Sequence, residues 1–93
     1  MAYAVQFFVN STGYVEGSMP PRFDKKHVKP IPMCGSDGYY KPDGRWGRDH
    51  VEDAAINRAR AMNKNLNSGI VGYKIMRCRI HGDDIPAGIF KSI

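Results

Sequence analysis

The stretch AYAVQFFVN, residues 2–10, decides how this chain of 93 residues folds. In an extended segment, one side of this stretch carries Tyr3, Val5, Phe7 and Val9. The other side carries Ala4, Gln6, Phe8 and Asn10. This alternation predicts a β-strand with one strongly apolar face. Such a face needs a covering layer, and the rest of the chain contains one clear candidate.

The covering layer is predicted to be one helix over about residues 49–66. Asp49 is placed to cap its amino end, Glu52 follows three residues later as in a capping box, and residues 67–69 can close its carboxyl end. Arg58 interrupts the apolar side, so we expect its guanidinium to reach solvent or an ion-pair partner, with a binding role as the alternative. The apolar side itself carries Val51, Ala54, Ala55, Ala59, Met62 and Leu66.

Further extended segments are predicted to complete the sheet. Ser-Thr-Gly at 11–13 indicates a hairpin in which residues 14–16 return alongside residues 2–10. Pro-Asp-Gly at 42–44 indicates a second hairpin, between residues 39–41 and 45–46. Residues 70–81 are predicted to form a long strand in which Gly72 marks a bulge. The apolar residues of the tail, 85–93, predict an edge strand or a packed flap.

The predicted fold is a single α+β domain over residues 1–93, with an antiparallel sheet of about four strands and one helix packed on one face. The chain is too short for two independent cores. Residues 17–47 hold all but one of the six prolines and half of the ten glycines, so no helix runs through them. This segment is predicted to be a long proline-rich loop, and loops of that length are usually functional or mobile.

The composition indicates a folded protein with excess positive charge. A hydrophobic content of 42% is too high for a disordered chain. The net charge of +5 favours an acidic partner, namely nucleic acid, an acidic protein surface or an anionic membrane, unless the charge only serves solubility. The longest apolar run, at 3–9, is too short to span a bilayer and no secretion signal precedes it. We therefore expect a cytoplasmic protein that does not bind membranes.

No combination of residues typical of an enzyme active site is evident in the sequence. The histidines are scattered along the chain, at His27, His50 and His81. Cys34 and Cys78 lack partners at zinc-ligand spacing and are expected to be free thiols. Asp83 and Asp84 adjoin in a turn, where capping is their expected role, and no glycine segment has the ending of a phosphate-binding loop. We predict a non-enzymatic protein without a cofactor or a metal ion.

Basic side chains form three clusters, which are the predicted partner-binding residues. Arg77 and Arg79 are expected on the same strand face as Tyr73, an arrangement that can meet phosphates and stack a base. The second cluster, Arg45 and Arg48, flanks Trp46, which is expected to be packed rather than exposed. For each cluster the alternative is a solvated surface. The third cluster lies between prolines that stiffen its flanks and comprises Arg22, Lys25, Lys26 and Lys29.

Three segments, YAVQFFVN, DHVEDAAINRARAMNKN and GYKIMRCRI, together resemble small accessory proteins of bacteriophages, in particular anti-CRISPR inhibitors of surveillance complexes. The resemblance implies blockade: the inhibitor occupies a surface of a host protein or ribonucleoprotein complex and denies it to the target strand. Lys and Arg would then meet guide-RNA phosphates or an acidic protein patch. We expect a monomer. The competing hypothesis is a stand-alone nucleic-acid-binding module that uses Tyr73, Arg77 and Arg79 as its platform.

Overall fold

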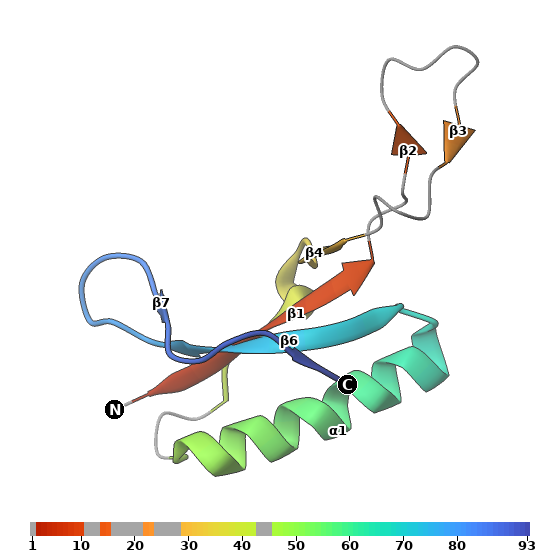
Figure 1. The fold of residues 1–93 in the computed structure, drawn as a ribbon. Coiled ribbons are helices and arrows are strands. Elements are labelled where there is room, and N and C mark those ends of the chain that lie inside the picture. Colours follow the sequence, from red (N-terminus) through yellow and green to blue (C-terminus); the bar gives the residue numbers. More distant parts are fainter. Residues whose placement is uncertain (1, 11–13, 16–21, 24–28, 43–45) are drawn as a thin grey trace.

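In the described part of the chain, one α-helix packs against a curled antiparallel sheet (Figure 1). The computed structural model describes residues 2–10, 14–15, 22–23, 29–42 and 46–93. For residues 14–15 and 22–23 it describes the backbone alone. The predicted α+β class is confirmed.

Two long strands form the centre of the main sheet. β1 (Tyr3–Asn10) and β6 (Ile70–Arg77) run antiparallel, in a register that extends from the Tyr3↔Arg77 pair to the Val9↔Ile70 pair. The other edge of β1 pairs with β4 (Pro30–Pro32) and β5 (Tyr39–Tyr40), which follows the 3-10 helix η2 (Ser36–Gly38). The other edge of β6 pairs with β7 (Ile85–Pro86) and β8 (Lys91–Ser92). Six strands thus occupy four positions across the sheet.

The predicted hairpin between residues 2–10 and 14–16 is wrong. β6 occupies one edge of β1, and β4 and β5 occupy the other, so no edge is left for a hairpin partner. Instead β2 (Tyr14–Val15) pairs with β3 (Arg22–Phe23) in a separate two-stranded sheet. The turn of the second predicted hairpin, at 43–45, lies outside the described residues, and β5 pairs with β1.

The bulge and the tail follow the predictions made from the sequence. The β1–β6 register shifts between Phe8 and Val9, and Phe8 is the residue opposite Gly72. The tail supplies β7 and β8 along the edge of β6. It also covers part of the sheet face that lacks the helix, where the rings of Phe90 and Phe8 meet edge to face with centroids 5.4 Å apart.

The helix α1 (Arg48–Leu66) covers one face of the sheet. Gly47 occupies the position before its first turn and no side chain caps that end, so the predicted capping role of Asp49 is wrong: Asp49 lies inside the first turn, where its charge suits the helix dipole. At the other end Asn67 is left-handed, with φ of 51°, which confirms that the helix closes there.

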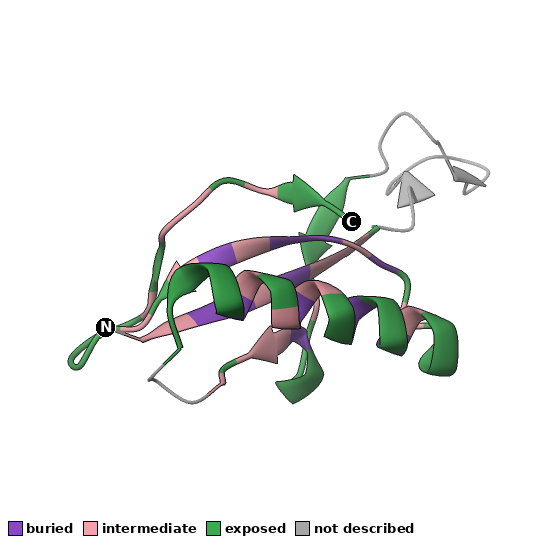
Figure 2. Cartoon of the chain, turned by 90° about the horizontal axis from the view of Figure 1, so that it is seen from below, coloured by how far each residue is buried: buried purple, intermediate pink, exposed green. Residues whose placement is uncertain are grey.

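The core lies between α1 and the two central strands (Figure 2). The predicted apolar faces meet there, but Leu66, the last residue of the helix, is 68% exposed, contrary to the prediction. Trp46 is 42% exposed rather than packed. The core residues contributed by these three elements are Val5, Phe7, Val51, Ala55, Ala59, Met62, Ile70, Tyr73 and Ile75.

Polar side chains fix the helix to the sheet at its margins. Glu52 accepts hydrogen bonds from the Tyr73 hydroxyl and from Lys91 Nζ, each at 3.1 Å, and so links α1 to β6 and β8. Arg58 is exposed, as one of the two expected outcomes has it, and its guanidinium makes a cation–π contact 5.2 Å from the ring centroid of Tyr40. Burial and the bond to Glu52 raise the pKa of Tyr73 to about 12.

Asn63 joins the end of the helix to the start of β6, and its removal is expected to cost about 1–3 kcal/mol. Its side-chain amide donates to the Ile70 carbonyl and its oxygen accepts the Ile70 N–H, both at 2.8 Å. Asn63→Ala leaves both backbone groups without these partners at a residue that is 4% exposed. Urea denaturation measures the loss, and Asn65→Ala, an exposed position on the same helix, is the control. Equal effects of the two variants would contradict this role.

Candidate functional site

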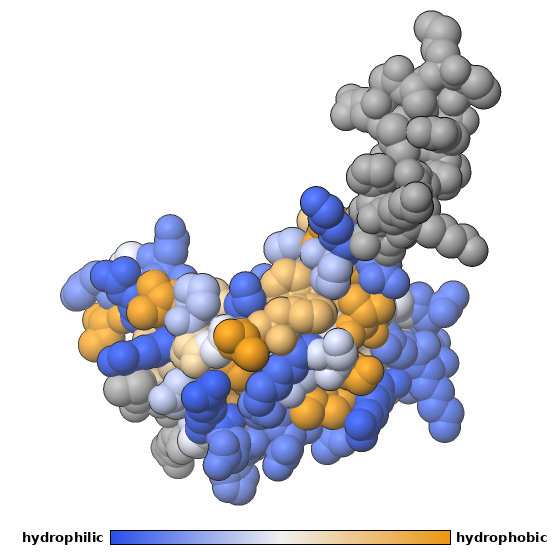
Figure 3. Space-filling view, in the orientation of Figure 1, coloured by the Kyte–Doolittle hydropathy of each residue, from blue (hydrophilic) through white to orange (hydrophobic). Residues whose placement is uncertain are grey.

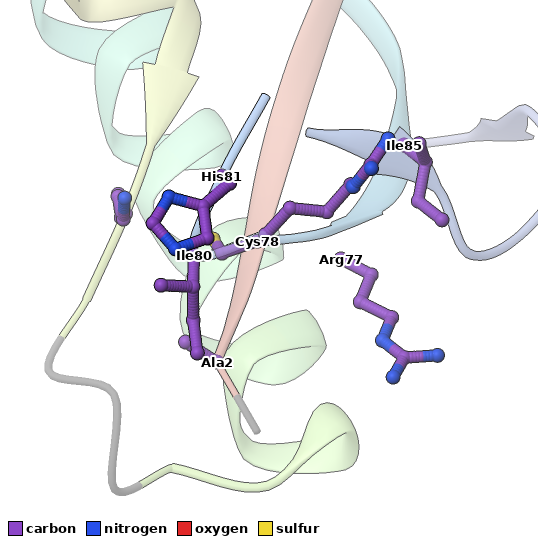
Figure 4. A pocket seen from close by; sticks show the side chains of 8 residues that line it. Ala2, Arg77, Cys78, Ile80, His81 and Ile85 are labelled. Atoms are coloured by element: carbon purple, nitrogen blue, oxygen red, sulfur yellow. The ribbon is translucent and has the colours of Figure 1, made fainter. Parts of the chain in front are cut away.

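A hollow opens where β6 ends and β1 begins (Figure 4). Its volume is about 1000 Å³. The register of the two central strands places Arg77 beside Tyr3, and the Cys78 N–H donates to the Ala2 carbonyl at 3.0 Å. β7 then returns to pair Ile85 with Arg77. The side chains that line the hollow include Lys41, Arg77, Arg79, Ile80, His81 and Ile85.

The loop at 78–84 is held in place by one carboxylate. Asp84 Oδ1 accepts the Arg79 N–H at 3.2 Å, and Oδ2 accepts a hydrogen bond from the Tyr39 hydroxyl. The bond from Tyr39 lowers the pKa of Asp84, whereas burial and the same bond raise the pKa of Tyr39. Asp84 therefore has the turn role that the sequence predicts, and it also joins the loop to β5.

The hollow carries positive charge. Lys41, Arg77 and Arg79 are exposed, and no carboxylate among the described residues forms an ion pair with any of them. Asp84 lies close enough to Lys41 for the ammonium to lower the pKa of its carboxyl, but both oxygens of Asp84 already accept hydrogen bonds. An anionic group entering the hollow would therefore meet cations that the described part of the chain does not neutralise.

Apolar surface lies next to these charges. Ile80 is 95% exposed and Ile85 is 41% exposed. Figure 3 shows hydrophobic residues among hydrophilic ones at the end of the molecule where the loop lies. A nearly fully exposed isoleucine in a loop fixed by Asp84 has few neighbours within the chain to pack against. Single exposed apolar residues are common, but two beside one hollow form a surface suited to contact.

Cys78 contributes a neutral thiol to the lining of the hollow. Burial, together with the negative charge of Asp84, raises the pKa of the Cys78 thiol, which disfavours the thiolate needed for nucleophilic attack. Both cysteines are free, as predicted. Within the described residues, no group of three or more His, Cys, Asp or Glu side chains could hold a metal ion.

Two predicted partner-binding residues lie together here, and one prediction is corrected. Arg77 and Arg79 both line the hollow. Tyr73, by contrast, is 3% exposed, packs in the core and donates its hydroxyl to Glu52. The strand face that bears Tyr73 is the face that α1 covers, so the predicted platform of Tyr73 with the two arginines does not exist.

The remaining predicted residues are distributed elsewhere. Lys29 is exposed beside β4, which pairs with the far end of β1. That end lies about 23 Å from the hollow, given the usual rise of a strand. Arg48 is exposed at the start of α1, and its guanidinium lies over Gly88. The backbone of Arg22 belongs to β3, whereas Lys25, Lys26 and Arg45 lie outside the described residues.

Several residues of the hollow are missing from the predicted set. Lys41 is an isolated cation before a turn, and nothing in the sequence links it to Arg77. Ile80 and Ile85 did carry a usable signal, because they flank the polar segment His-Gly-Asp-Asp, where a buried isoleucine is not expected. His81 is exposed at the same loop.

No helix in the described residues has both the length and the apolar character needed to cross a membrane.

Comparison with known proteins leaves the hollow as the main guide to function. No family model matches the chain, and neither a curated protein sequence nor a solved structure matches it.

Proposed function

We propose that this protein is a non-enzymatic inhibitor of the phage type, which binds a host nucleic-acid-handling complex and blocks access of the target strand. The observation that carries the proposal is the gathering of Lys41, Arg77 and Arg79 around one hollow beside exposed Ile80. Guide-RNA phosphates or an acidic protein patch on such a complex would attract these cations, which form no ion pair within the described residues.

The chemistry of the hollow favours binding over catalysis. The raised pKa of the Cys78 thiol favours its neutral form, and the carboxylate of Asp84 already accepts hydrogen bonds from Tyr39 and from the Arg79 amide. These groups fix the loop in one conformation. A surface that is already ordered loses less conformational entropy when a partner binds.

Charge reversal at the hollow tests this function. The chain is immobilised, exposed to a lysate of the bacterial host, and the retained proteins are identified with and without nuclease treatment. We expect a complex that contains nucleic-acid-handling proteins, and we expect Arg77→Glu/Arg79→Glu to reduce its retention about tenfold or more. Excess free chain should also prevent the retained complex from binding a labelled target strand.

The control reverses the same number of charges on the outer side of α1. Arg60 and Lys64 are exposed on the helix, away from the lining of the hollow, so Arg60→Glu/Lys64→Glu should retain the complex. Retention that survives reversal at Arg77 and Arg79 would contradict the proposed site, and failure to retain a defined complex would contradict the function. Binding of generic DNA or RNA by the purified chain, with no defined protein complex retained, would favour the stand-alone nucleic-acid-binding module instead.

A further inference from the structure

We propose that the hollow recognises an acidic peptide segment that carries an aliphatic side chain, so that the contact of the inhibitor is with protein rather than with a nucleic-acid backbone. This inference rests on the proposed function and names the partner chemistry of the same site. Three properties of the lining support it: its charge, its apolar rim and the kind of side chain that it lacks.

The positive charge of the lining indicates that the ligand of the hollow is negatively charged. Lys41 approaches from the end of β5, whereas Arg77 and Arg79 come from the end of β6 and from the residues after it. The cations therefore come from two segments of the chain that meet at the hollow. A peptide with two or three carboxylates close together matches such a compact cluster of charges. A phosphate backbone is better matched by a stripe of cations along a groove.

The apolar residues of the lining, Ile80, Ile85 and Ala2, indicate that the ligand also carries an aliphatic group. Ile80, at 95% exposure, has nearly all of its side chain available to a partner, and Ile85 and Ala2 also line the hollow. In Figure 4 the side chain of Ile80 lies next to Ala2 on one side of β1, and Arg77 and Ile85 lie on the other side of β1. A leucine or isoleucine from a partner would bury this surface while its neighbouring carboxylates reach the arginines.

Within the described residues, the lining lacks the side chains that usually hold nucleic-acid bases. Proteins that bind single strands stack bases on aromatic rings. Tyr39 uses its hydroxyl to hold Asp84, and the rings of Phe8 and Phe90 pack against each other. Among the residues that line the hollow, His81 has the one ring, and the remainder are aliphatic, basic or sulfur-containing. This composition favours a protein segment over RNA or DNA.

Synthetic peptides test the inference directly. The full chain is titrated at low salt with an acidic peptide containing leucine, with the same peptide containing serine, and with a basic peptide containing leucine. Oligouridine of similar length is the nucleic-acid probe. We expect the acidic leucine peptide to bind about tenfold more tightly than the serine peptide, because one aliphatic group is withheld. Amide NMR shifts should change at residues 77–85.

Matched variants separate the hollow from the rest of the surface. Ile80→Ser should weaken the acidic leucine peptide about tenfold, whereas Ile89→Ser should change little, since Ile89 is 77% exposed and is not part of the lining. Arg77→Gln/Arg79→Gln should weaken both acidic peptides. Arg60→Gln/Lys64→Gln is the control for the loss of charge.

Each result supports or overturns the inference. Absence of binding by the acidic leucine peptide, equal binding of the serine peptide, or indifference to Ile80→Ser would overturn it. Tighter binding of oligouridine, lost in Arg77→Gln/Arg79→Gln, would assign the hollow to nucleic acid. In that case capture of a host complex by the chain would still stand, so the failure of this inference is distinguishable from the failure of the proposed function.

Discussion

Phe7→Ala is expected to reduce the free energy of unfolding by about 3–5 kcal/mol. Phe7 has no exposed surface, and it is the largest of the fully buried side chains, at the middle of the interface between β1 and α1. Removing its ring deletes apolar contacts in the core and leaves a cavity that the neighbouring side chains fill only in part. Since single domains have total stabilities of about 5–15 kcal/mol, this loss is a large share of the total.

Phe8→Ala is the matched control for this prediction. Phe8 is adjacent in sequence, but it points to the opposite face of the sheet and is only partly buried, in contact with Phe90. We expect a loss of about 1–2 kcal/mol, measured for both variants by urea denaturation followed by circular dichroism. If Phe8→Ala cost as much as Phe7→Ala, the assignment of the covered face would be wrong.

Gly72→Ala is expected to destabilise the protein by about 2–3 kcal/mol through the carboxyl-terminal segment. A Cβ at this position would lie 2.2 Å from the ring of Phe90 and 2.6 Å from the Lys91 carbonyl oxygen. The ring of Phe90 can rotate away, but the carbonyl belongs to the backbone of β8. The Gly72↔Ser92 pair must therefore separate, and β8 should leave the edge of β6.

Hydrogen exchange locates this effect, because the amides of residues 91–93 should lose protection while those of β1 keep theirs. Gly47→Ala is the control, since a Cβ there meets nothing within 4 Å and the backbone has an ordinary φ of −70°. The Gly72→Ala/Phe90→Ala double variant should lose less than the sum of the two single variants. Strictly additive losses would show that Gly72 and Phe90 do not contact each other.

The parts of the fold that depend on local sequence were predictable. The alternation in residues 2–10 and the apolar side of the helix are set by neighbouring side chains, and both faces meet as expected, with Val5 and Phe7 against Val51 and Ala55. The partners of the strands were less predictable. A turn signal at 11–13 favours a hairpin, but β6 pairs with β1 at seven positions and contributes apolar residues to the same core, which outweighs a short local return.

The hollow could not be predicted from the sequence, because it too depends on contacts between residues that are distant along the chain. Its geometry depends on the bond between Tyr39 and Asp84, which are 45 residues apart and belong to no recognisable motif. Alternation did place Arg77 and Tyr73 on the same side of one strand, but it cannot show that Tyr73 is buried under α1 while Arg77 remains exposed. Exposure at the end of a strand is a property of the neighbouring elements.

The two prolines of β4 determine how the sheet can meet other chains. The Met33 N–H points towards β1, where it donates to the Phe7 carbonyl, so the alternation of an antiparallel strand turns Pro30 and Pro32 to the outer edge. Neither proline has an N–H to offer there. Another strand that approached β4 would find no donors at these two positions, so this edge is closed to strand addition and to the sheet-to-sheet growth that begins amyloid-like aggregation.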